Sequence, residues 1–243
     1  MSVASMLLLG GLTGPATAGR LDHAEQYRAC LTLAHRDARG AIESAAVWRQ
    51  AGGGAAADHC TAVALIELQQ YADAAIRLEA LAAELPADSR VNPADILGQA
   101  ANAWLLADRD DEALRLIGEA LAMAPNAPEL HVDRARILAH HGQYEAALDD
   151  LDKALAVDPA NDDALAFRAS ALRRQGRLVD ALADATTALE INPDNASARL
   201  ERGLVQKALG DAEAARVDWR ETVARHAGTP AGDAANQYLQ SLD

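Results

Sequence analysis

Histidine and carboxylate side chains are the groups in this sequence that would bind a metal ion or transfer protons. The seven histidines are scattered, and His140-His141 is the one adjacent pair. Neighbouring residues of a helix point about 100° apart, so this pair is a poor face for two ligands of one ion. The sequence therefore predicts no metal site and no cofactor.

A cluster of carboxylates at Asp108-Arg109-Asp110-Asp111-Glu112 has mixed charge and lies at a predicted turn and helix start. The helix macrodipole stabilises carboxylates in the first turn, so the cluster has a structural explanation. The chain has no Gly-x-Ser-x-Gly motif, no His-Glu-x-x-His motif and no phosphate-binding loop. We predict no catalytic residues. An enzyme with a site between the N-terminal hairpin and the following repeats is a remote alternative.

A repeat of 34 residues is the main pattern in the sequence, and the structure it forms must position any binding surface of the protein. Three sets of residues share this spacing with Pro125, Pro159 and Pro193, namely Gly142, Gly176 and Gly210; Ala147, Ala181 and Ala215; and Ala120, Ala154 and Ala188. A period of this length is typical of a solenoid of helix–turn–helix units. Aromatic residues make up only 3% of the chain, so we expect a core of Ala and Leu, which are good helix formers.

Residues 128–161 illustrate one repeat. A first helix of about residues 129–141 ends at Gly142, which suits the left-handed conformation that follows many helices. A second helix of about residues 144–157 ends before Pro159, because proline cannot continue a helix.

Residues of these types in this order resemble the tetratricopeptide repeat. The matching positions are Ala135, Gly142, Tyr144, Ala147, Ala154 and Pro159 in one repeat, and Leu97, Ala101, Trp104, Ala113, Ala120 and Pro125 in the repeat before it. In the earlier repeat Asp108 stands at the glycine position. The resemblance implies an all-α fold, a right-handed helix-turn-helix α-solenoid closed by a C-terminal capping helix.

The predicted organisation has four parts. They are a signal peptide at residues 1–18, a degenerate helical hairpin at 19–54, an array at 55–229 and a capping helix at 230–243. The repeats of the array are residues 55–88, 94–127, 128–161, 162–195 and 196–229, with a five-residue insertion before residue 94. Gly52-Gly53-Gly54 predicts a flexible break before the array.

The N-terminal segment favours export. Met6–Leu12 is an apolar run too short to span a bilayer, and Ala16-Thr17-Ala18 matches the pattern cut by signal peptidase, although no basic residue precedes Arg20. We predict a periplasmic or secreted protein. The alternative is a cytoplasmic protein with an apolar tail. No later segment has the roughly 18 consecutive apolar residues of a transmembrane helix.

The formal net charge of −14 argues against nucleic acid as a partner, because nucleic-acid backbones attract basic surfaces. A solvated acidic surface that aids solubility is the simpler explanation of this charge.

Cys30 and Cys60 are separated by about the length of one helical hairpin. In a stacked solenoid the equivalent helices of neighbouring hairpins lie side by side, which would bring the two Cα atoms within the roughly 7 Å that a disulfide requires. A disulfide would fit export. The alternative is a pair of buried free thiols that act as small apolar residues.

The resemblance implies that the first helix of each repeat lines a concave face, with the second, fifth, sixth, ninth, twelfth and thirteenth positions projecting from it. Candidate partner-binding residues at these positions are Asn102, Arg136, His140, Phe167, Ser170, Arg173, Arg174 and Glu201. An aromatic ring beside three arginines would suit an apolar or acidic peptide. The clamp with which chaperone-binding members hold a two-carboxylate tail is absent, because Glu129, Asp133 and Asp163 stand at its positions.

These expectations favour a non-catalytic protein–protein interaction module that binds a protein or peptide partner in its concave groove, in the periplasm of a bacterium. The alternative is a structural adaptor subunit of a larger cell-envelope complex without a free peptide ligand.

Overall fold

The structure is a computed structural model that describes residues 22–86 and 91–242. Helices in this part of the chain come in pairs joined by short turns. They are α1 (His23–Arg36) and α2 (Ala38–Trp48), α3 (Gly54–Glu67) and α4 (Tyr71–Glu84), α5 (Pro93–Leu106) and α6 (Asp110–Met123), α7 (Pro128–His140) and α8 (Tyr144–Val157), α9 (Asp162–Arg174) and α10 (Leu178–Ile191), and α11 (Ala196–Ala208) and α12 (Ala212–Arg225), followed by α13 (Pro230–Gln240). The predicted signal peptide lies outside the described residues.

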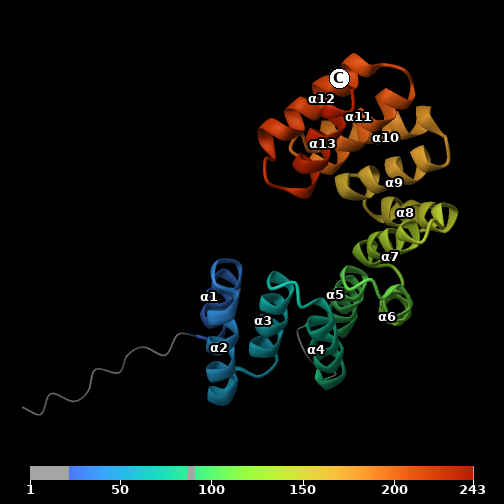
Figure 1. The fold of residues 1–243 in the computed structure, drawn as a ribbon. Coiled ribbons are helices and arrows are strands. Elements are labelled where there is room, and N and C mark those ends of the chain that lie inside the picture. Colours follow the sequence, from blue (N-terminus) through green and yellow to red (C-terminus); the bar gives the residue numbers. More distant parts are fainter. Residues whose placement is uncertain (1–21, 87–90, 243) are drawn as a thin grey trace, which may run out of the picture.

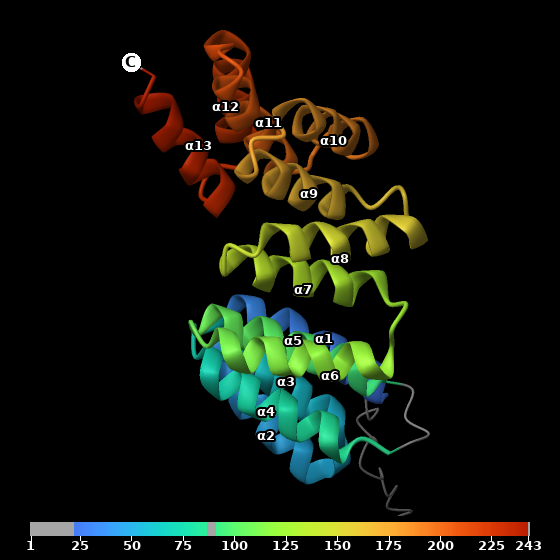
Figure 2. The ribbon, with the colours of Figure 1, turned by 90° about the vertical axis from the view of Figure 1, so that its right-hand side faces the viewer.

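Successive pairs stack into a solenoid, because each second helix packs against the first helix of the next pair as well as against its own partner. Figure 1 shows the pairs along an arc, with α1 and α13 on the same side of the central pair α7 and α8. In the perpendicular view of Figure 2, α7 and α8 lie side by side between the N-terminal and C-terminal parts of the stack. The predicted all-α solenoid with a C-terminal capping helix is confirmed.

The turn inside each pair from α3 and α4 onward uses a backbone conformation with positive φ. Gly142 and Gly176 take it with φ of 73° and 77°, as their spacing predicts. Asp108 and Gln69 take the same conformation in the two earlier pairs, with φ of 56° and 58°. A residue with a Cβ loses about 1–2 kcal/mol in this region. The packing of the helices therefore maintains the turn even where glycine is missing.

We predicted a flexible break at the three glycines where α3 begins, and this prediction is wrong. A π-helical segment, η1 (Arg49–Gly53), continues from α2 and leads into α3. Gly52 and Gly54 have φ of 97° and 49°, so they form the kink between the two helices. Gly53 lies against the ring of Trp48, where a side chain would clash. The glycines are thus needed for a tight, packed corner.

Fully buried alanines bring the two helices of a pair close together. The same position of α4, α6, α8, α10 and α12 holds an alanine with 0% exposure in every case: Ala74, Ala113, Ala147, Ala181 and Ala215. A small side chain lets the second helix approach the first at native packing density, and a larger one would overpack the contact.

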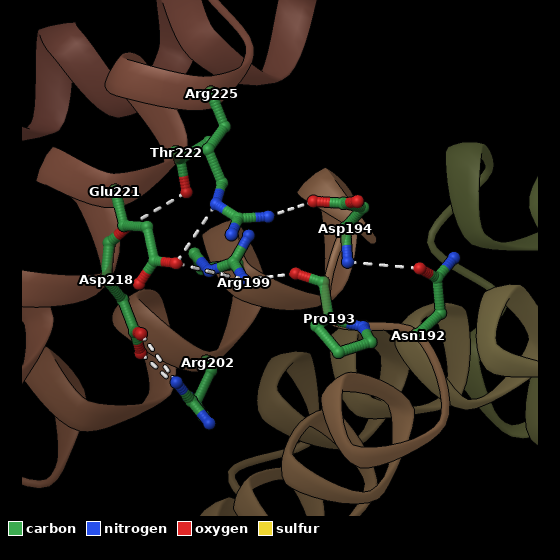
Figure 3. A network of polar contacts seen from close by, with 9 residues as sticks. All are labelled: Asn192, Pro193, Asp194, Arg199, Arg202, Asp218, Glu221, Thr222 and Arg225. Atoms are coloured by element: carbon green, nitrogen blue, oxygen red, sulfur yellow. Dashed lines mark hydrogen bonds and ion pairs between the residues drawn. The ribbon is translucent and has the colours of Figure 1, made fainter.

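An arginine of the first helix binds an aspartate of the second in three consecutive pairs. In each pair the Nε and Nη2 atoms of the arginine donate to the two carboxylate oxygens, at 2.6–2.9 Å, and the bonded residues are Arg134–Asp150, Arg168–Asp184 and Arg202–Asp218. Figure 3 shows the last of these bonds between α11 and α12. Both positions recur every 34 residues through these three repeats, so each of the three rebuilds the same bidentate contact.

The aspartate of the first of these bonds is almost completely buried. Burial alone would raise the pKa of Asp150, but hydrogen bonds from Arg134 and His131 outweigh it and hold the pKa below its usual value. The carboxylate is therefore ionised, and the ion pair is intact, at neutral pH.

Helix α13 covers the C-terminal end of the solenoid. The ring of Tyr238 stacks on the buried Trp219 of α12, with centroids 5.3 Å apart, and Leu239 and Leu242 pack against the same cluster. Thr229 caps the helix by accepting a hydrogen bond from the Gly232 amide. A terminal repeat needs such a cover because no further repeat buries its apolar face.

We predict that Asp184→Asn and Asp152→Asn have unequal effects, although both carboxylates bind Arg168. The side chain of Asp184 is 13% exposed and that of Asp152 is 63% exposed. Losing the buried partner should lower the free energy of unfolding by about 1.5–3 kcal/mol, and losing the exposed one by less than about 1 kcal/mol. Urea unfolding of both variants measures the difference. Equal costs would show that the bidentate bond is not the important contact.

Two glycine substitutions should change stability in opposite directions. Gly176 has positive φ, so Gly176→Ala should lower the free energy of unfolding by about 1 kcal/mol or more. Gly118 lies inside α6 with open space around it, so Gly118→Ala should raise the same quantity by about 0.5–1 kcal/mol. Thermal unfolding of the two variants beside the unmodified protein checks both signs.

Candidate functional site

The first helices of the pairs form the inner face of the arc. Neighbouring first helices contact one another at α1–α3, α5–α7, α7–α9 and α9–α11, whereas successive second helices make no comparable contact within the described ranges. Helices on the inside of a curved stack approach more closely than those on the outside. The concave face is therefore lined by α1, α3, α5, α7, α9 and α11.

A chain of contacts crosses the centre of the concave face. Arg136 Nη1 donates to Asp133 Oδ1 of α7 at 3.1 Å, and the side chain of Asn102 in α5 lies close enough to lower the pKa of the same carboxyl group. The Arg136 guanidinium also lies over the ring of Phe167 in α9, 5.7 Å from its centroid. Burial raises the pKa of Asp133, and the hydrogen bond from Asn102 and the charge of Arg136 only partly oppose it. Three predicted residues are thus brought together, with Asn102 and Arg136 beside the carboxylate and Phe167 against Arg136.

The C-terminal part of the concave face holds the other candidates. Arg173 binds Glu201 of the next first helix through its Nε atom, and both side chains are largely buried. Ser170 is half-buried, while Arg174 is exposed and makes no hydrogen bond or ion pair with any described residue. Since Arg136 and Arg173 both have carboxylate partners, Arg174 is the one uncompensated charge among the three predicted arginines.

His140 and His141 both bind a single carboxylate. His140 Nδ1 and His141 Nε2 lie 3.2 and 3.3 Å from the same oxygen of Asp110. Asp110 is at the start of α6, so the two imidazoles link the first turn of one helix to the end of α7. In the part of the chain that the structure describes, no group of three or more His, Cys, Asp or Glu side chains is arranged to hold a metal ion.

A pocket of about 690 Å³ opens at the N-terminal end of the concave face. It lies between α3 and α5, which approach each other less closely than the other neighbouring first helices do. The predicted five-residue insertion falls between α4 and α5 at this place in the chain. The walls are mostly apolar and include Ala24, Ala55, Ala56, Leu81, Leu85 and Ile96.

A row of hydrogen bonds crosses this N-terminal pocket from α1 to α5. The Tyr27 hydroxyl lies 2.8 Å from His59 Nδ1, and His59 Nε2 lies 2.7 Å from Gln99 Oε1. Because a carbonyl oxygen only accepts, Nε2 donates to Gln99 and Nδ1 accepts from the tyrosine. Burial raises the pKa of Tyr27, which keeps its hydroxyl protonated as a donor. The row fixes three polar groups inside an apolar pocket.

Sequence reasoning did not select these three residues as site residues. His59 and Gln99 stand at the fifth and sixth positions of their repeats, so the positional rule that identified Asn102 would have found both. Tyr27 belongs to the degenerate first hairpin, where no repeat register exists. Only the structure places it opposite His59.

A disulfide joins α1 to α3 beside the N-terminal pocket. Cys30 and Cys60 are bonded, with their Cα atoms 6.1 Å apart. Cys30 lies one turn after Tyr27, and Cys60 directly follows His59. The bond therefore ties together the two helices that carry the first two members of the polar row.

The helix pairs and their 34-residue register are matched by a known family. Two profiles described as tetratricopeptide repeat match residues 102–173 and 168–230. The chain contains tetratricopeptide repeats. Among curated proteins, none matches the sequence.

Several solved structures share the fold, and two of the three that follow are described as tetratricopeptide repeat proteins. A tetratricopeptide repeat protein from Parabacteroides merdae ATCC 43184 is 15% identical, with 92% of this chain and 85% of that one covered and a TM-score of 0.72. A thermophilic tetratricopeptide repeat protein of Thermus thermophilus is 24% identical over 61% of this chain and 82% of its own, with a TM-score of 0.57. MamA from Desulfovibrio magneticus RS-1 is 16% identical over 73% and 97%, also with a TM-score of 0.57. At these identities the likeness concerns the fold alone.

Within residues 22–86 and 91–242, every helix is too short or too polar to cross a membrane.

The disulfide should contribute measurably to stability. It closes a loop of 30 residues, so replacing both cysteines by alanine should lower the free energy of unfolding by about 3–4 kcal/mol in the chain-entropy model. Urea unfolding with and without a reductant measures this loss, and the double variant should not respond to the reductant. Titration of two free thiols in the native, unreduced protein would contradict the bond.

Proposed function

We propose that this protein is a non-catalytic interaction module that binds a partner protein or peptide segment in the concave groove of its tetratricopeptide array. The observation that carries the proposal is the part of the groove at Phe167 and Arg174. There a half-buried aromatic ring and an exposed, uncompensated guanidinium lie two turns apart on α9. A preformed groove costs a partner less conformational freedom on docking.

The proposed location is the periplasm or the outside of the cell. The Cys30–Cys60 disulfide supports it, because disulfides persist in oxidising compartments and are rare in the cytosol of most organisms. The apolar run and the Ala16-Thr17-Ala18 pattern of the sequence point the same way.

A structural adaptor in a larger envelope complex is the second candidate. Three exposed apolar residues recur every 34 positions at the ends of second helices, outside the groove: Met123, Val157 and Ile191. Such a row would suit a permanent neighbour along the edge of the solenoid.

Crosslinking pulldown from the native host tests the groove. We expect Phe167→Ala combined with Arg174→Glu to lose the captured partner, because both side chains face the groove and the arginine has no carboxylate to leave unpaired. Arg220→Glu is the matched control, since Arg220 is an exposed arginine of the outer helix α12 with no partner among the described residues.

Capture that survives the groove variant would contradict this proposal. Capture lost instead on Val157→Glu would favour the adaptor. Circular dichroism should show unchanged helix content in all three variants.

A further inference from the structure

The N-terminal pocket has the dimensions and lining of a binding site. Its volume of about 690 Å³ lies in the range of pockets that hold a small ligand or a large side chain. Apolar walls surround a few fixed polar groups, and the hydrogen-bonded row of Tyr27, His59 and Gln99 holds those groups in place. The disulfide beside the row keeps α1 and α3 together, so the pocket exists before any partner arrives.

Among the described residues that line this pocket, the formally charged side chain is a carboxylate. Asp95 lines the pocket, and its described lining residues include neither Lys nor Arg. Glu129 and Asp163 occupy the equivalent position of the next two first helices, 34 and 68 residues further on. All three carboxylates are exposed and lie in the first turn of a helix, where the macrodipole stabilises them. A row of negative charge therefore continues from the pocket along the groove.

A fourth carboxylate, that of Asp133, adds to the acidic groups of the same region. Asp133 stands one turn after Glu129, at the position equivalent to Gln99 of the pocket. Burial raises its pKa and the nearby charge of Glu129 adds a little, while Asn102 and Arg136 only partly offset them. A positively charged group of a partner would stabilise the ionised form of this carboxylate. The neighbouring Arg136 is already shared with Phe167.

We propose that the N-terminal pocket takes a large apolar side chain of a partner segment whose adjacent residues are basic and pair with Asp95 and Glu129. This inference rests on the proposed function and names the chemistry of the partner. It differs from the sequence expectation of an acidic peptide, because that expectation counted three arginines of which two are already paired. It also places the anchor at the N-terminal end of the groove, away from Phe167 and Arg174.

The test is selection of a random peptide library displayed on phage against the full-length protein, followed by affinity measurements with the selected peptides made synthetically. We expect the selected peptides to contain an aromatic or large aliphatic residue beside Arg or Lys. Ala55→Trp should weaken their binding about tenfold or more, because Ala55 is an exposed wall residue and the indole would fill the pocket.

Asp95→Lys tests the charge without filling the pocket. It should weaken the same peptides several-fold at low salt, and the difference from the unmodified protein should shrink as salt is added. Glu145→Lys is its matched control, because Glu145 is also an exposed carboxylate in the first turn of a helix, but on the outer helix α8. That variant should bind the peptides as the unmodified protein does.

Three results would overturn the inference. Selected peptides that are acidic would reverse the charge preference. Peptides that bind Ala55→Trp and Asp95→Lys normally, but fail on the Phe167 and Arg174 double variant, would leave the groove function standing without the pocket. Peptides that bind every variant equally would contradict both proposals.

Thermal unfolding of Ala55→Trp and Asp95→Lys should match that of the unmodified protein. If the tryptophan variant unfolds at a lower temperature, Asp95→Lys alone tests the charge preference of the site.

Discussion

The close approach of two helices through one small side chain is the constraint on which the whole stack depends. An alanine with no exposed surface stands at the same place in α4, α6, α8, α10 and α12. It sets the distance between the helices of a pair, and the pair then sets the surface offered to the next one. In the last three pairs the bidentate bond of arginine to aspartate adds a directional lock, because two parallel hydrogen bonds form only in one relative position of the helices. Curvature, the inner face and the groove all follow from these repeated contacts.

The fold could be predicted because its determinants are local and periodic. Gly142, Gly176 and the prolines mark helix ends by backbone rules that need no knowledge of the partner helix. The prediction failed at Gly52–Gly54, where glycine serves close packing on Trp48 and not flexibility. The glycine rule does not cover Asp108, which adopts the glycine conformation because the helices around it impose the turn. In both places tertiary packing determines the backbone conformation, and this packing cannot be inferred from a single sequence.

The residues of the groove were predicted less well than the helix pairs of the solenoid, because position in a repeat does not show how side chains pair. Position in the repeat tells which residues face inward, and it selected Asn102, Arg136 and Phe167, which the structure brings together. It does not tell which charges are already neutralised, since the partner of Arg173 comes from the next repeat and that of Arg136 from a residue three positions away. The N-terminal pocket was missed because it arises where α3 and α5 approach each other less closely than the other first helices do, and a wider spacing of two helices leaves no sequence motif. Its wall from α1 lies in a hairpin without repeat register.

The disulfide between Cys30 and Cys60 makes the two ends of the molecule unequal in how they unfold. A solenoid is held by nearest neighbours, so its terminal pairs open first and opening spreads inward. At the C-terminus α13 can detach as a unit, which leaves Trp219 and the last groove helix accessible to local opening. At the N-terminus α1 cannot leave α3 while the bond is intact. We therefore expect native-state hydrogen exchange to begin at the C-terminal end of the stack, and α1 and α3 to open only together.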